Sequence, residues 1–116
     1  MSISFEGIGS EVITVKKNGS LKKGDLCYFS GNQQVSPATA NSGFQGKVLE
    51  VYDDGTASVQ IRGYMEMNYA SGAPFTGYGY QGISCTNATT VHNDNQGRQY
   101  LVVGINTVKK TVGIML

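Results

Sequence analysis

The residues that could form a histidine-activated thiol are few: one histidine, His92, and two cysteines, Cys27 and Cys85. An imidazole activates a thiol when the two lie within hydrogen-bonding reach, so His92 with either cysteine is the pairing that this chemistry would need. His92 stands in a polar turn, where an imidazole is typically solvated. Cys27 lies in an apolar run and Cys85 far from it in a polar one, so we predict free thiols rather than a disulfide bridge.

The carboxylates have structural uses. Asp25, Asp53, Asp54 and Asp94 all fall in predicted turns, where short acidic side chains hydrogen-bond the backbone. None of them is placed for acid–base catalysis, and a single histidine excludes a metal site built on a histidine pair. We therefore predict no catalytic residue, no metal and no cofactor, and we expect a protein that is not an enzyme.

Residues 77–82, GYGYQG, match the glycine pattern of dinucleotide-binding loops. That motif works because its glycines lead into a helix whose N-terminus holds the pyrophosphate. No helix pattern follows here, since a polar stretch begins at Cys85. We interpret the match as accidental.

The glycine-rich segment 68–82 has the strongest binding character, through four aromatic residues: Tyr69, Phe75, Tyr78 and Tyr80. A connection of this length is usually functional or ordered by a partner, and tyrosine offers a large contact area at low cost in conformational entropy. The rings could also stack on single-stranded bases or merely cover a small core. No Lys or Arg occurs between residues 68 and 97, so we favour contact with protein over contact with nucleic acid.

The N-terminal stretch 1–11 is small and polar, with three spaced apolar residues: Ile3, Phe5 and Ile8. Such a stretch is either a frayed terminus or an arm that orders on a partner and buries these side chains there. It lacks a charged start followed by a long apolar run, so we expect neither a signal peptide nor a membrane span.

The composition indicates one all-β domain over residues 12–116, a small barrel or sandwich of antiparallel hairpins, preceded by a flexible arm over 1–11. The 116 residues include 16 glycines and no Trp, only 15% are charged, and no segment has helical periodicity. Many turns and few charges are typical of small all-β proteins. A net charge of +1 does not provide the basic surface that nucleic-acid binding requires.

Two predicted β-hairpins form the framework that must position the candidate residues. In segment 46–67, pairing Tyr52 with Thr56 across a turn ending at Gly55 predicts one buried face, which Met65 and Met67 extend: Leu49, Val51, Ala57, Val59 and Ile61. In segment 100–116, pairing Asn106 with Thr111 predicts facing glycines at 104 and 113 and a core set: Leu101, Val103, Ile105, Val112 and Ile114. Segment 35–45 is predicted as a loop.

The segment 18–26, NGSLKKGDL, resembles the Gly-Asp-hydrophobic step found early in small structural proteins of tailed bacteriophages. Segments 46–51, 100–106 and 112–116 are similar in style. From about Val12 onward the chain thus resembles the capsid decoration proteins, also named head auxiliary or cement proteins. The resemblance implies an all-β fold, often trimeric, bound to the outside of an icosahedral shell, and it brings no catalytic residues.

We therefore expect a structural virion protein, assembled in the host cytoplasm, that binds the outer surface of a phage capsid and stabilises it. The expected partners are the major capsid protein and further copies in a homotrimer, with no nucleic acid and no membrane. We assign the capsid contact to Ile3, Phe5 and Ile8, and the subunit interface to the four aromatic residues of segment 68–82. The alternatives are a tail or fibre module and an oligonucleotide-binding β-barrel.

Overall fold

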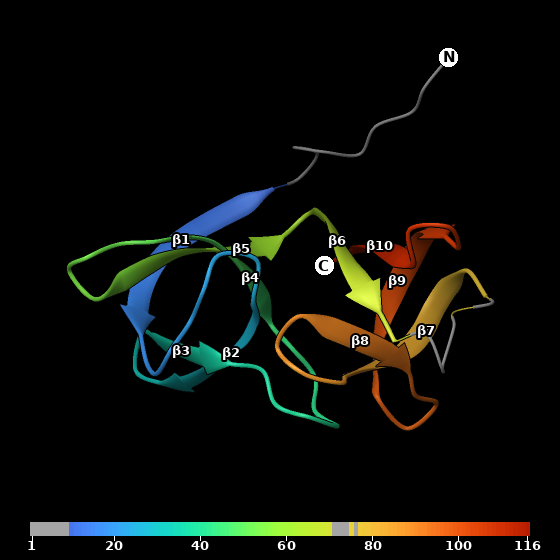
Figure 1. Ribbon diagram of the computed structural model, residues 1–116, viewed down its shortest axis with the longest axis horizontal. Helices are drawn as coiled ribbons and strands as arrows, with labels where there is room; N and C mark the ends of the chain where they lie inside the picture. The colour runs from blue at the N-terminus through green and yellow to red at the C-terminus, as the bar shows by residue number, and fades with distance from the viewer. Residues whose placement is uncertain (1–9, 71–74, 76) are drawn as a thin grey trace, which may run out of the picture.

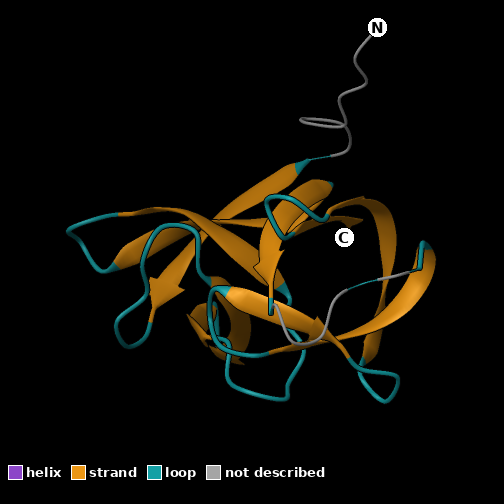
Figure 2. Ribbon diagram, turned by 45° about the vertical axis from the view of Figure 1, so that its right-hand side comes forward, coloured by secondary structure: helices purple, strands orange, loops and turns teal. Residues whose placement is uncertain are grey.

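The computed structural model describes residues 10–70, 75 and 77–116. Within these ranges the chain consists of strands, turns and loops without a helix, which confirms the predicted all-β fold (Figure 2). The same ranges accordingly hold no helix long and apolar enough to cross a membrane. The strands close into two five-stranded barrels that lie side by side along the long axis of the molecule (Figure 1).

The first barrel follows the chain from Glu11 to Arg62. Its strands run around the barrel in the order β1-β3-β2-β4-β5, and β5 returns to pair with β1. The β1–β3 pairing is parallel and the other four pairings are antiparallel. The strand bounds are β1 (Glu11–Lys17), β2 (Leu26–Gly31), β3 (Gln34–Pro37), β4 (Gly46–Val51) and β5 (Thr56–Arg62).

The second barrel has the same topology. Its order is β6-β8-β7-β9-β10, closed by β10 on β6, and its single parallel pairing is β6 with β8. Each strand of the second barrel therefore has a counterpart in the first barrel, five strands earlier in the chain. The strand bounds are β6 (Tyr64–Tyr69), β7 (Gly79–Cys85), β8 (Thr90–Asn93), β9 (Arg98–Asn106) and β10 (Thr111–Met115).

The correspondence extends to individual residues. Lys17 of β1 pairs with Val35 of β3, and Tyr69 of β6 pairs with Val91 of β8. The N–H of Lys17 donates to the carbonyl of Gly55 at 3.0 Å, and that of Tyr69 donates to Lys110 at 3.0 Å. The fold is thus an internal structural duplication, in which residues 11–62 and 64–115 build the same barrel twice.

A glycine joins the two barrels. Gly63 lies between β5 and β6 with a φ of +98°, a conformation that residues with a Cβ rarely adopt. Its backbone exchanges two hydrogen bonds with Leu116. The predicted extension of the first hairpin's buried face to Met65 and Met67 is therefore wrong, because both residues lie in β6 and face the core of the second barrel.

Both predicted hairpins form, each with a β-bulge that sequence alternation did not indicate. In the first, Val51 faces Ala57 as predicted, but Val48 rather than Leu49 faces Val59. In the second, Ile105 faces Val112 as predicted, but Val102 rather than Val103 faces Ile114. An extra residue on one strand reverses the side-chain alternation beyond it. Leu49 and Val103 are therefore the bulged residues, at equivalent positions of the two barrels.

The bulges also change the predicted core. Val48 and Val102 are buried at 1% exposure each, whereas Leu49, Leu101, Val103 and Ile105 are only half-buried. Ala57, Val59, Val112 and Ile114 are fully buried, as predicted. The core prediction was therefore correct for these four residues, while Ile61, Val51 and Ile105 are half-buried against the clusters, and beyond each bulge it was wrong by one residue on β4 and β9.

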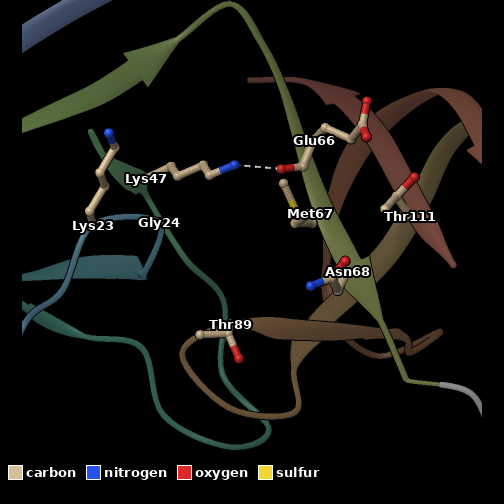
Figure 3. A pocket seen from close by; sticks show the side chains of 8 residues that line it. All are labelled: Lys23, Gly24, Lys47, Glu66, Met67, Asn68, Thr89 and Thr111. Carbon is tan, nitrogen blue, oxygen red and sulfur yellow. Dashed lines mark hydrogen bonds between the residues drawn. The ribbon is translucent and has the colours of Figure 1, made fainter. Parts of the chain in front are cut away.

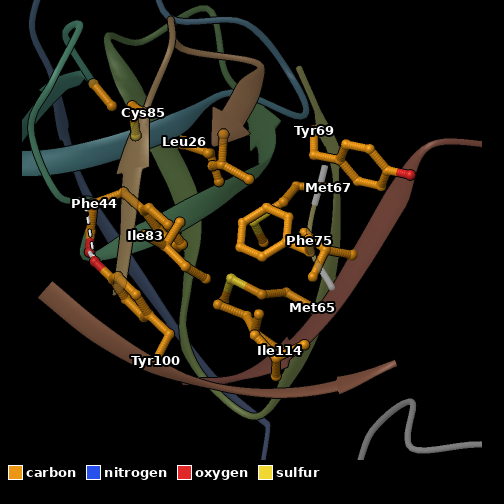
Figure 4. Close-up of a cluster of buried hydrophobic side chains, with 14 residues drawn as sticks. Leu26, Phe44, Met65, Met67, Tyr69, Phe75, Ile83, Cys85, Tyr100 and Ile114 are labelled. Atoms are coloured by element: carbon orange, nitrogen blue, oxygen red, sulfur yellow. Dashed lines mark hydrogen bonds between the residues drawn. The ribbon is translucent and has the colours of Figure 1, made fainter. Parts of the chain in front are cut away.

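The two barrels do not have separate interiors. A smaller cluster fills the first barrel, with Val15, Leu21, Cys27, Val35, Val48, Ala57 and Val59. A larger cluster fills the second barrel and includes Leu26, Ala38 and Phe44, which come from the first half of the chain (Figure 4). The β3–β4 loop also extends the second sheet, because the N–H of Asn41 and the carbonyl of Ser42 bond the backbone of Cys85, each at 2.8 Å.

Strand residues lie within two segments that were predicted as loops. Segment 35–45 begins with β3, in which Val35 is fully buried. The connection predicted over residues 68–82 is shorter in the structure, because residues 68 and 69 end β6 and Gly79 begins β7. Glu11, the last residue of the predicted arm, begins β1, and residues 1–9 lie outside the described part of the chain.

Candidate interaction surface

The thiols are not arranged for nucleophilic chemistry. Cys27 and Cys85 are both free, as predicted, and both are buried. Burial raises the pKa of Cys27 to about 12, with a further contribution from the charge of Asp25. Burial likewise raises the pKa of Cys85 to about 11. Both thiols therefore stay protonated at neutral pH, and the thiolate that a nucleophile requires does not form.

The single histidine is bonded elsewhere. Nδ1 of His92 lies 2.9 Å from Oγ1 of Thr86. In the strand pairing of β7 with β8, His92 faces Ser84, whereas Cys85 faces Val91 and points into the core. Successive side chains of a strand point to opposite faces, so His92 and Cys85 lie on opposite sides of the sheet. The histidine–cysteine pair considered from the sequence is not formed with Cys85.

The turn aspartates hold backbone in place. Oδ2 of Asp25 accepts a hydrogen bond from the N–H of Lys22 at 2.9 Å. Hydrogen bonds from Thr56 lower the pKa of Asp54, and bonds from the Gln96 N–H and the Ser84 hydroxyl lower that of Asp94. Among the described residues, no group of three or more His, Cys, Asp or Glu side chains could hold a metal ion.

A polar groove marks the seam between the barrels. Nζ of Lys47 on β4 donates to the carbonyl oxygen of Glu66 on β6 at 2.6 Å (Figure 3). Burial lowers the pKa of Lys47, opposed by the charge of Glu66. The groove, of about 350 Å³, is lined from both halves of the chain: Lys23, Gly24, Lys47, Glu66, Met67, Asn68, Thr89 and Thr111.

A second polar contact fastens the same seam. Nε2 of Gln60 on β5 donates to the carbonyl oxygen of Tyr64 at 2.9 Å and to that of Arg62 at 3.0 Å. Lys47 and Gln60 face each other in the β4–β5 pairing. Lys47 and Gln60 therefore hold the outer face of the first barrel against the backbone at the start of β6.

The predicted interface aromatics separate into two groups. Tyr69 and Phe75 are buried at 6% and 3% exposure, and their rings meet edge to face with centroids 5.9 Å apart. Tyr78 and Tyr80 are 64% and 68% exposed. Two of the four predicted interface residues thus pack inside the chain, and only Tyr78 and Tyr80 have surface to offer a second subunit.

Tyr80 belongs to a larger feature that the sequence did not indicate. In the strand pairings it faces Leu101 of β9, Leu101 faces Met115 of β10, and Met115 faces Tyr64 of β6. All four point outward, since their neighbours Val102, Ile114 and Met65 are buried. We refer to Tyr80, Leu101, Met115 and Tyr64 as the outer row. The bulge at Val103 conceals it, because simple alternation places Leu101 in the core.

The predicted capsid-contact residues Ile3, Phe5 and Ile8 lie outside the described part of the chain. Comparisons with known proteins add no relationship to this picture: no protein-family model matches the chain, and neither the curated proteins nor the solved structures hold a significant match. The candidate surface therefore depends on its own geometry.

Proposed function

We propose that this chain is a structural virion protein that binds the outer surface of a phage capsid and stabilises it, acting as a homotrimer. The observation that carries the proposal is the outer row, an outward-facing apolar and aromatic strip in which Tyr80 is exposed and the other three side chains are half-buried. Exposed aromatic residues on a rigid framework are typical of protein–protein contact. The resemblance to decoration proteins gives the partner, the major capsid protein.

The fold supports a mechanical role. Closing each sheet into a barrel reduces the exposed sheet edge at which a chain could unravel or aggregate. The shared hydrophobic cluster and the Lys47–Glu66 contact couple the barrels to each other. A body of this kind transmits load between its contact points, which is what reinforcement of a shell demands.

Trimer formation supplies affinity. Each copy needs only a modest contact with the shell, because linked contacts raise the overall avidity without any stronger single contact. A threefold assembly also matches the local threefold axes of an icosahedral shell. In this scheme Ile3, Phe5 and Ile8 contact the capsid, and Tyr78 and Tyr80 lie at or near the contact between copies.

The test is binding to shells assembled from the major capsid protein of the source phage. Wild-type protein should sediment with the shells and raise their melting temperature, and a cryo-electron microscopy map should show it on the outer surface. Deletion of residues 1–9 should abolish sedimentation while the protein remains folded and oligomeric. A truncated protein that coats shells at wild-type occupancy would overturn the assignment of the arm, and wild-type protein that never binds shells would overturn the function.

A second candidate, an oligonucleotide-binding module, has one observation in its favour. Tyr80 and Tyr78 are exposed at a strand of a closed five-stranded barrel, and such barrels present aromatic rings on which bases stack. A net charge of +1 argues against it. A retention assay with single-stranded oligonucleotides at low salt tests this second candidate. Tight binding that weakens steeply with added salt would favour it.

A further inference from the structure

The internal duplication allows the two barrels to be compared face by face. The strand pairings make Lys47 of the first barrel equivalent to Leu101 of the second, and Gln60 equivalent to Met115. Lys47 faces Gln60 across β4 and β5, and Leu101 faces Met115 across β9 and β10. The same outward position is thus occupied by a polar pair in one barrel and by an apolar pair in the other.

In the first barrel this position contacts the second barrel, with Gln60 buried and Lys47 half-buried. Lys47 donates to the carbonyl of Glu66 and Gln60 donates to that of Tyr64, so both side chains end on the backbone of β6. In the second barrel Leu101 and Met115 are half-buried, and Tyr80 beside them is 68% exposed. In the described part of the chain, β6 therefore receives one copy of this face, whereas Tyr80 in its equivalent is left exposed.

The surface that receives the first barrel also has a duplicate. The strand equivalent to β6 is β1, and the pairings match Tyr64 with Val12 and Glu66 with Thr14. β1 pairs with β3 only at Lys16 and Lys17, as β6 pairs with β8 only at Asn68 and Tyr69. Val12 is 49% exposed and Thr14 is also exposed. We refer to Val12 and Thr14 as the β1 face.

We propose that copies of this chain associate head to tail, with Tyr80, Leu101 and Met115 of one copy docked on the β1 face of the next. This contact between chains repeats the contact that joins the barrels within a chain. The apolar side chains of Leu101 and Met115, which replace Lys47 and Gln60, suit this contact between chains. The residue that receives them, Val12, is itself apolar and exposed. A second copy is the occupant, since this chain itself carries both faces of the contact.

The geometry has a consequence for assembly. A contact between two different faces is heterologous, so it produces a ring when the rotation closes and a filament when it does not. Closure at three copies rests on the proposed function, whereas the contact itself does not. Self-association is measured without any capsid, so failure of this contact and failure of capsid binding are separate results.

The experiment uses full-length protein and light scattering coupled to size-exclusion chromatography. Tyr80→Lys alters the outer row and Val12→Lys alters the β1 face, both at exposed positions where folding should tolerate the change. Val108→Lys is the matched control, because Val108 is 91% exposed in the β9–β10 turn and belongs to neither face. We expect the control to assemble as wild type does, and each face variant to lose affinity by at least about tenfold.

Mixing distinguishes a head-to-tail contact from a symmetric one. Each face variant retains one intact face, and the two intact faces are complementary, so an equimolar mixture of Tyr80→Lys and Val12→Lys should form a dimer and stop there. The proposal is overturned if wild-type protein is monomeric at every concentration, if both face variants assemble normally, or if the mixture stays monomeric. It is also overturned if Tyr80→Lys assembles normally yet loses occupancy on shells, since the outer row would then bind the capsid.

Discussion

The hydroxyl of Tyr100 closes a two-way hydrogen bond with the backbone of Phe44: it accepts from the Phe44 N–H at 3.0 Å and donates to the Phe44 carbonyl. The two rings stack with centroids 4.5 Å apart and an interplanar angle of 2° (Figure 4). Both side chains are buried. One tyrosine thus satisfies the backbone of the β3–β4 loop where that loop enters the core of the second barrel.

Tyr100→Phe should therefore destabilise the protein although it keeps the ring. The change leaves the N–H and carbonyl of Phe44 buried without this partner, which costs about 1–3 kcal/mol. Urea denaturation measures the loss in the free energy of unfolding. Tyr52→Phe is the control, because the Tyr52 hydroxyl bonds Ser58 at the exposed surface and its removal should change stability by less than about 0.5 kcal/mol. Equal effects of the two substitutions would contradict the role given to Tyr100.

The bulge in β9 makes neighbouring valines unequal. Val102→Ala should cost about 1–3 kcal/mol, since it empties a fully packed position, whereas Val103→Ala at the half-buried bulge should cost less than about 1 kcal/mol. Simple alternation along the strand predicts the opposite order. Thermal and urea unfolding of the two single variants compares them directly, and a larger loss for Val103→Ala would place the bulge elsewhere.

Equivalent turns in the two barrels carry different residues at a left-handed position. Gly55 has a φ of +87°, and its counterpart Lys110 has a φ of +57°. Lysine is strained there and glycine is not, so Lys110→Gly should stabilise the protein by about 1 kcal/mol. Gly55→Ala should destabilise it by a similar amount. Lys109→Gly removes the same charge from a residue without that φ, so it should bring no gain in melting temperature.

The buried thiols make stability fall at alkaline pH. The pKa of Cys85 is about 11 in the folded protein against an ordinary value of 9.0. Above pH 9.0 the unfolded chain therefore releases a proton that the folded chain retains, and the free energy of unfolding decreases as the pH rises towards 11. Cys27 contributes in the same direction, to still higher pH.

Urea midpoints measured between about pH 8 and pH 10.5 test this linkage. Cys85→Ala should show a shallower decline than wild type over that range, because one linked group has been removed. Iodoacetamide at about pH 8 should label neither cysteine in folded protein and both in urea. Rapid labelling of native Cys85, or parallel pH profiles for the two proteins, would contradict the burial that raises its pKa.

Local patterns in the sequence determined the fold class and both hairpin turns. Alternating apolar residues on either side of Asp53–Gly55 predicted the Val51–Ala57 pairing, and the same reasoning predicted Ile105 opposite Val112. Turn chemistry and strand alternation depend on residues close together in the chain, so they are visible without a structure. The free state of the two cysteines was predictable for a similar reason, since Cys27 lies in an apolar run.

Only the tertiary structure decided the rest. Leu49 and Val103 look like core residues until a bulge moves them outward, and bulges depend on the partner strand rather than on the bulged residue itself. Tyr69 and Phe75 looked like interface residues, yet the second barrel closes around them. The duplication was not predicted from the sequence: equivalent core positions such as Val48 and Val102 are both apolar, but outward positions such as Lys47 and Leu101 differ in polarity. What the two barrels share is backbone pairing, and pairing between distant strands exists only once the chain has folded.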